Sequence, residues 1–443
     1  MTSLKLQALS QFRQQVYQLF YPSRDAAFEI MDAITESPAA RSAVEVSLAP
    51  GMQRKFSSVH KGLERTRLEA GQLTPLLVEM AEAQEHFLVA GYAVYALDHT
   101  PYPRRAAPTV SDRGFVHGAE GQVVGHQYSL LGRVMHVQGS WVGVTDIRRI
   151  PTSTSPTQLG AQQVADLKAV SRRPVIVTAD SEYFTAPLLA QAEPGRCELL
   201  IRLKGNRVLY DAPPPPAPGR RGRHPVHGPR LKLNQPATLR PPEPTVAARG
   251  RRQYRLEEAD GSWIELSLRQ NVHERRQPAR PLCVLRVEQF NPDGTRRFSR
   301  PLWLVWTGPL DMDWPTFWKV YLRRVCLEGV HQFIKNSLAW TRARLGYTDR
   351  EERWTWLVVL AYWQLLLALP AARDARRPWE KPTAAGRWPS PARVQRDVGR
   401  ILAQLGTPVR PPKPRGNPRG RPRGYHPAPR LRYPVVYKGL GHT

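Results

Sequence analysis

The order of strands and helices expected between residues 89 and 203 constrains the fold of this chain more than any other feature. Three strand-like stretches come first, and helical and strand-like stretches then alternate. The expected strands are 89–97, 123–136, 141–147, 174–178 and 197–203, and the expected helices are 158–170 and 186–192. The strands are short apolar runs rich in β-branched and aromatic residues, and the helices have apolar residues three and four apart. This order favours a mixed α/β sheet.

The flanks of this segment have different patterns. Residues 1–90 show helical spacing at 4–20, 25–34 and 68–87, with breaks at Pro and Gly between them. Residues 253–306 are strand-like again, with turn residues between the apolar runs. We therefore expect a helical N-terminal part and a second region rich in strands.

Two Pro- and Arg-rich regions stand apart from these elements. Residues 206–252 are dominated by Pro, Gly and Arg, which argues against a packed helix or a central strand and predicts a flexible or polyproline segment. Two long helical stretches are expected later, at roughly 314–345 and 350–369. Beyond residue 370 the chain is again rich in Pro and Arg and has no acidic residue after Asp397, which predicts a disordered basic tail.

Basic residues greatly outnumber acidic ones. Lys and Arg number 65 against 37 Asp and Glu, which leaves a net charge of +28 and indicates nucleic acid as the first candidate partner. The most apolar run, 356–368, is too short to span a bilayer and predicts a buried helix, so we expect no membrane partner. The three cysteines form no CxxC pair and the first residues lack a secretory signal, which fits the cytoplasm.

Four polar side chains recur at helical spacing late in the chain. They are Tyr321, Arg324, Glu328 and Lys335. At about 100° per residue on one helix they point at roughly 0°, 300°, 340° and 320°, so all four share one narrow face. An ordinary charged face held by ion pairs is the alternative explanation for this quartet.

The spacing of the quartet resembles the Tyr-Arg-Glu-Lys signature of bacterial insertion-sequence transposases of the DDE type. With a β-rich insertion set aside, the element order also resembles the ribonuclease H-like core of those enzymes. Sequence patterns and resemblance together divide the chain into a helical N-terminal domain (1–88), two core segments (89–205 and 308–370), a Pro/Arg-rich linker with a β-rich insertion (206–307) and a basic tail (371–443). The resemblance covers roughly residues 89–370, and it explains neither the Pro/Arg-rich segment 206–252 nor the basic tail. Relatives recognise DNA ends with the N-terminal domain, and dimerisation or packing is the alternative role for it.

Two aspartates fall where a metal-dependent nuclease needs them. Cleavage of a phosphodiester by two metal ions requires hard oxygen ligands that converge from several elements. Asp98 ends the first expected strand and Asp180 the fourth, and ligand sites form at strand ends in open α/β sheets. The resemblance adds Glu328 and implies two Mg²⁺ ions, or Mn²⁺, held by the three carboxylates. A capping or turn role is the alternative for each aspartate, with Asp146 as reserve for the first position and Glu182 for the second.

The remaining site residues are cationic or phenolic. The resemblance assigns Tyr321, Arg324 and Lys335 to holding a DNA phosphate, which suits a phenol donor, a forked guanidinium and an ammonium. In the tail, Arg419 and Arg421 belong to an Arg-Gly-Arg-Pro sequence that resembles the core of an AT-hook, whose arginines enter a narrow minor groove. A tail that binds phosphates without sequence preference is the alternative.

These predictions lead to one expected activity and two alternatives. The expected protein is a transposase that cleaves double-stranded DNA at the ends of a mobile element and transfers the strands into target DNA. The resemblance implies a homodimer on paired DNA ends, in the bacterial cytoplasm with the nucleoid. The alternatives are a transposase-derived DNA-binding protein without catalysis, and a ribonuclease H-like nuclease that transfers no strands.

Overall fold

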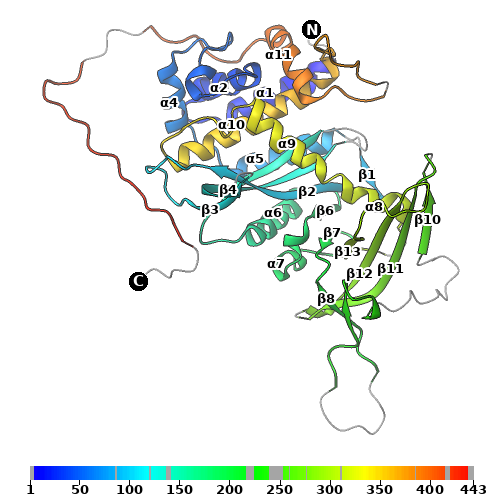
Figure 1. Ribbon diagram of the computed structural model, residues 1–443. Helices are drawn as coiled ribbons and strands as arrows, with labels where there is room; N and C mark the ends of the chain where they lie inside the picture. The colour runs from blue at the N-terminus through cyan, green and yellow to red at the C-terminus, as the bar shows by residue number, and fades with distance from the viewer. Residues whose placement is uncertain are drawn as a thin grey trace. The chain divides into compact units, whose positions relative to one another are not determined.

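The computed structural model divides into two compact units, each built from separate stretches of chain (Figure 1). Unit 1 contains Met1–His86, His99–Pro156 and Val325–Thr443, and unit 2 contains Phe87–Asp98 and Thr157–Arg324. The structure describes residues 4–84, 87–118, 121–135, 141–215, 224–238, 253–258, 260–275, 277–309, 312–384, 386–414 and 420–437. Both units combine helices with strands, so the predicted mixed α/β class is confirmed. The predicted domain boundaries stay predictions.

Unit 2 is built on a mixed sheet. Its strand order is β2-β6-β7-β13-β12-β11-β8-β9, with β1 on β2 and β10 on β11. The strands are β1 (Leu88–Val89), β2 (Tyr92–Pro103), β6 (Val175–Ala179), β7 (Cys197–Leu203), β8 (Val208–Asp211), β9 (Arg230–Lys232), β10 (Gln253–Glu257), β11 (Trp263–Glu274), β12 (Gln277–Phe290) and β13 (Leu302–Trp306). β2, β6 and β7 run parallel, whereas the other pairs are antiparallel. The first and fourth expected strands are therefore neighbours.

The parallel strands of unit 2 are buried on both faces, as parallel strands covered by helices usually are. Every residue of β6 is buried. Helix α6 (Pro156–Val170) approaches this sheet so closely that a Cβ on Gly160 would lie 2.8 Å from the Tyr183 ring and 3.0 Å from the Leu97 side chain. Leu97 precedes Asp98, so the contact packs α6 against the strand position next to the first candidate aspartate.

The Pro- and Arg-rich segment is more ordered than its composition predicts. β8 and β9 both fall within 206–252 and pair with each other, and β8 also pairs with β11. The prediction of a flexible or polyproline segment is therefore wrong for these residues. Leu209 and Leu231 are buried and directly paired with each other, and the pairing of Tyr210 and Asp211 with β11 attaches the segment to the insertion.

Unit 1 has a core of helices around α10 (Thr348–Ala368). Its other longer helices are α1 (Gln7–Leu19), α2 (Arg24–Glu36), α4 (Phe56–Arg65), α5 (Ala70–Ala83), α9 (Val325–Ser337) and α11 (Pro391–Leu405). α10 contacts α1, α2, α4 and α11 (Figure 1). By length and composition the stretch Thr348–Ala371 would cross a membrane, but 89% of its most apolar window is buried in the protein. The buried helix predicted at 356–368 is confirmed.

Three further strands lie in unit 1, and β5 among them packs against helices α5 and α10. β3 (Gly114–Gly118) and β5 (Val142–Ile150) both pair antiparallel with β4 (Gly121–Val134). The Trp363 indole of α10 donates a hydrogen bond to the Val144 carbonyl oxygen of β5 at 2.6 Å. β3 was not expected, because its sequence GFVHG carries two glycines and too few apolar residues to indicate a strand.

The last helix corrects a prediction. Residues 391–405 form α11, whose buried face contains Val394, Val398, Ile401 and Leu402 and contacts α2, α9 and α10. The prediction of a disordered tail is therefore wrong for this segment. Its apolar residues have amphipathic spacing, which the surrounding Pro and Arg obscure. Gly406 (φ +72°) ends the helix in a backbone conformation that glycine adopts without strain.

Candidate active site

Asp98 and Asp180 follow the last paired residues of two adjacent parallel strands. In the β2–β6 register the final pair is Leu97 with Ala179, and each aspartate is the next residue. Neighbouring strands lie about 4.8 Å apart, so the two backbones carry their carboxylates side by side on one face of the sheet. The register of β2 and β6 therefore brings together the two aspartates that were selected from the sequence.

The structure corrects the local setting of Asp98. The sequence places it at the end of a strand, but β2 continues to Pro103, so Asp98 lies within a strand. Residues 92–97 are buried, Asp98 and His99 are half-buried, and Thr100 and Tyr102 are buried again, so Asp98 opens a partly exposed step within a buried strand. The site therefore forms where the parallel pairing of β2 with β6 ends, rather than where strand β2 ends.

Asp180 has a buried oxygen without a hydrogen bond. Its Oδ1 is inaccessible to solvent and accepts no hydrogen bond from the residues that the structure describes. Arg202 forms an ion pair with it, with Nη1 4.0 Å from Oδ1. A buried carboxylate oxygen of this kind costs free energy unless something binds it, and a divalent cation is a fitting ligand for hard oxygen.

Arg202 on β7 adds a charged side chain beside Asp180, on the next strand of the sheet. The β6–β7 register ends with Ala179 paired to Ile201, so Arg202 lies next to Asp180 as Asp180 lies next to Asp98. Arg202 was not singled out from the sequence. Two observations identify Arg202. It is the exposed residue of the otherwise buried strand CELLIRL, and the register, which sequence alone does not give, places it beside Asp180.

Tyr321 and Arg324 join the two aspartates within unit 2. Arg324 Nη1 lies 3.2 Å from Asp98 Oδ2, and its guanidinium carbon is 5.9 Å from the centre of the Tyr321 ring. Burial alone would lower the pKa of Arg324, but Tyr321, Asp98 and Asp180 outweigh it and raise that pKa. Burial and the Asp180 charge together raise the pKa of Tyr321 despite Arg324. At neutral pH the pair therefore presents a protonated phenol and a cation.

The quartet does not lie on one continuous helix, which corrects the sequence prediction. α8 (Trp314–Leu322) ends before Arg324, and α9 begins at Val325. At the junction the backbone hydrogen bonds join residues three positions apart, as in a 3₁₀ turn. They run from Arg323 N to Val320 O and from Arg324 N to Tyr321 O. No Gly or Pro marks this break. The buried ion pair of Arg324 with Asp98 is a tertiary interaction of the kind that overrides helix propensity.

Glu328 and Lys335 lie on α9 in unit 1. Glu328 is exposed in the first turn and Lys335 is in the last, where each charge favours the helix dipole. Seven residues separate them, so they share one helix face. Lys335 Nζ lies 2.6 Å from Thr100 Oγ1 of β2, which fixes the ammonium.

The Arg324 guanidinium provides a direct test of this arrangement. We expect Arg324→Lys to slow Mg²⁺-dependent DNA cleavage about a hundredfold, because an ammonium keeps the charge but loses the fork that orients a phosphate. The measurement is the nicking rate at saturating DNA, with Arg323→Lys as the neighbouring control. A wild-type rate for the Arg324 variant, or an equal loss in the control, would contradict the assigned role.

A cationic pocket of about 1040 Å³ lies beside Asp180 in unit 2. Ser181 lines it, and so do five cations: Arg202, Lys204, Arg286, Arg296 and Arg300. Among the described residues no carboxylate lines it, although Glu288 holds Arg286 and Arg296 in ion pairs of 2.9 Å each. The Trp303 indole forms part of the wall. Phosphate groups fit such a lining.

The reserve and tail residues have different settings. Asp146 is fully buried on β5 in unit 1, with Arg148 Nη2 2.7 Å from Oδ2, which gives it a structural ion pair. Glu182 is exposed in a short turn of helix after Asp180. Arg421 is exposed near the Tyr425 ring. Arg419 lies outside the described residues.

The carboxylates fit a divalent metal by their chemistry, not by a preformed cluster. Across the described stretches no three His, Cys, Asp or Glu side chains stand together as a ready metal-binding group. The fit rests on Asp180, whose buried Oδ1 lacks a hydrogen bond, and on Asp98 at the adjacent strand position. Both supply the oxygen ligands that Mg²⁺ prefers.

Comparison with known families agrees with this geometry. The profile of the family described as DDE superfamily endonuclease matches residues 15–263, which is more than half of the chain and includes Asp98 and Asp180. No curated protein matches the chain significantly. The recognition of a DDE-type protein is confirmed, whereas the Tyr-Arg-Glu-Lys signature stays a prediction. The chain belongs to the DDE superfamily endonuclease family.

Proposed function

We propose that this protein is a DDE transposase that cleaves double-stranded DNA at the ends of a mobile element and joins the freed 3′ hydroxyl to target DNA. The observation that carries the proposal is the β2–β6 register, which sets Asp98 beside Asp180 within the segment matched by the endonuclease family. The net charge of +28 supports a DNA substrate.

Three carboxylates are proposed to hold the metal. Asp98, Asp180 and Glu328 would bind two Mg²⁺ ions, with Mn²⁺ as a substitute. Such ions activate the attacking water or hydroxyl and stabilise the leaving oxygen. The unsatisfied Oδ1 of Asp180 supports this assignment in unit 2.

The cations and the phenol are proposed to orient the substrate. Arg324 offers a fork to two phosphate oxygens, and the protonated Tyr321 donates one hydrogen bond. Lys335 adds a point charge from α9. The pocket lined by Arg202 and Lys204 extends the cationic surface away from Asp180, so it would hold phosphates next to the one that is cut.

The proposed setting follows from the substrate. The DNA comprises element ends and a target, and a homodimer on paired ends would coordinate the cuts. The protein would work in the bacterial cytoplasm with the nucleoid.

One assay tests the activity and separates it from the alternatives. A duplex that carries the sequences flanking the coding region is incubated with the protein, a target plasmid and Mg²⁺. We expect nicked duplex and joined plasmid products, both lost with EDTA. Nicks without joined products would support a nuclease that transfers no strands, and binding without nicks would support a DNA-binding protein without catalysis.

A further inference from the structure

The segment after α11 is attached to unit 1 at two separate points. At the first, Arg410 N donates to Asp25 Oδ1 at 3.2 Å and the Arg54 guanidinium donates to the Arg410 carbonyl at 2.8 Å. Val409, just before, is buried. The chain is therefore held against α2 where it leaves α11.

The second attachment is made by backbone hydrogen bonds. Tyr433 N donates to the Pro108 carbonyl at 2.8 Å, and Val436 N donates to the Arg113 carbonyl at 2.7 Å. The Arg113 guanidinium in turn donates to the Tyr433 carbonyl at 3.1 Å, and the rings of Phe115 and Tyr437 lie 5.2 Å apart. Backbone pairing of this kind fixes the register of a segment, so residues 433–437 are docked rather than loose.

We call the described residues between these attachments, 411–414 and 420–432, the strap. All of them are exposed (Figure 1). Its described cations are Lys413, Arg421, Arg423, Arg430 and Arg432. In these two described stretches no cation is ion-paired to a carboxylate, and the chain contains no acidic residue after Asp397. The strap therefore exposes uncompensated positive charge.

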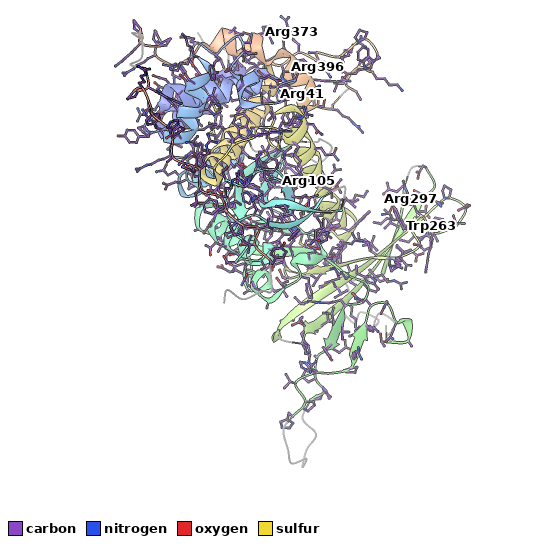
Figure 2. All side chains as sticks on the ribbon, turned by 60° about the vertical axis from the view of Figure 1, so that its left-hand side comes forward. Arg41, Arg105, Trp263, Arg297, Arg373 and Arg396 are labelled. Carbon is purple, nitrogen blue, oxygen red and sulfur yellow. The ribbon has the colours of Figure 1, made fainter. Side chains whose placement is uncertain are left out.

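The arginines just before the strap behave differently. Arg393, Arg396 and Arg400 of α11 pair with Asp374, Glu380 and Asp397. Hydrogen bonds from Arg396 lower the pKa of Glu380 to about 2, so that pair stays charged at neutral pH. Figure 2 shows Arg373 and Arg396 together at this end of unit 1. These cations are ion-paired within the fold, whereas those of the strap have no carboxylate partner in its described stretches. Arg430 lies over the Tyr347 ring at 6.0 Å and Arg421 over the Tyr425 ring at 5.8 Å.

We propose that the strap is a second DNA-binding site, closed on the protein at both ends, which contacts duplex phosphates without reading sequence. The inference rests on the proposed DNA substrate. Arginine forks suit phosphate, and proline keeps the backbone extended along a duplex. Closure raises the effective concentration of the arginines at DNA already bound elsewhere on the protein, so the docked end strengthens binding without a phosphate contact of its own.

Three variants of the full chain test the strap. The first replaces Arg421, Arg423, Arg430 and Arg432 with Gln. The second stops after Arg432, which removes the docked end and one cation, Lys438. The third, Lys438→Gln, controls for that lost charge. Binding to a 30-base-pair duplex of arbitrary sequence is measured at several salt concentrations, with melting temperature as the check on folding.

We expect the four-arginine variant to lower the slope of log K against log salt by about 3 to 4, near 0.9 for each phosphate contact. The truncation should weaken binding about tenfold more than Lys438→Gln while its slope falls by about 1 or less. An unchanged slope in the first variant overturns the strap as a DNA site, and a truncation equal to its control overturns the closure. Tighter binding to duplex RNA of equal length overturns the choice of DNA.

The same measurements separate this inference from the proposed function. A wild-type protein that shows the strap effect but never cleaves DNA would contradict the transposase proposal and leave the strap intact. A protein that cleaves DNA with no change in salt slope would contradict the strap alone.

Discussion

Asp180→Asn is expected to reduce Mg²⁺-dependent strand cleavage by about a thousandfold or more. Asparagine keeps the shape of the side chain but removes the charge that would hold a metal, and several kcal/mol of transition-state stabilisation depend on that ion. DNA affinity should be equal or slightly higher, because a negative charge near the phosphates is lost. The measurement is the nicking rate at saturating DNA alongside direct binding.

The structure adds a second readout for the same variant. Because Oδ1 of Asp180 is buried without a hydrogen bond, its replacement should not lower the melting temperature. Asp98→Asn should also stop cleavage, but it should destabilise the fold because it weakens the ion pair with Arg324. Glu182→Gln is the matched control. Full activity in Asp180→Asn with loss in the Glu182 variant would move the second metal ligand to Glu182.

The largest effect on stability is expected at Glu351, at the start of α10. This carboxylate is fully buried in unit 1, pairs with the buried Arg104 guanidinium, and has Oε2 3.1 Å from His126 Nδ1. Glu351→Gln leaves the buried Arg104 charge uncompensated. Removing one partner of a buried pair costs about 3–5 kcal/mol, so the free energy of unfolding should fall by that amount.

The next residue provides the control for Glu351. Glu352 pairs with Arg149 at 2.7 Å but its side chain is 43% exposed. A solvent-exposed pair contributes about 1 kcal/mol or less, so Glu352→Gln should change stability little. Chemical denaturation of both variants measures the difference. Equal losses would show that burial of Glu351 is not what makes its ion pair important.

The sequence predicts the strands that carry Asp98 and Asp180 because each is a short apolar run bounded by polar residues. A mixed sheet allows these two strands to be neighbours, but the sequence does not require it. The register does not follow from the sequence, and the register is what places Arg202 beside Asp180. Arg202 was missed for this reason, because in isolation it is one more arginine in a chain with 65 basic residues.

The helix expected from Tyr321 to Lys335 shows the limit of periodicity. Apolar and charged spacing continues through Arg323 and Arg324 without a breaker, so sequence indicates one helix. The ion pair of Arg324 with Asp98 joins residues 226 positions apart, and local patterns do not report such contacts. α11 was missed for the opposite reason, because amphipathic spacing is hard to see among many Pro and Arg.

The discontinuous make-up of each unit has a consequence for the gene. Unit 1 takes residues from the beginning, middle and end of the chain, and unit 2 from the two intervals between them. A premature stop anywhere before α11 would therefore leave unit 1 without helices that cover α2 and α10. Apolar faces left uncovered in this way favour aggregation. Frameshifted or shortened copies should accordingly accumulate as insoluble protein and should not act as competing inhibitors of the intact enzyme.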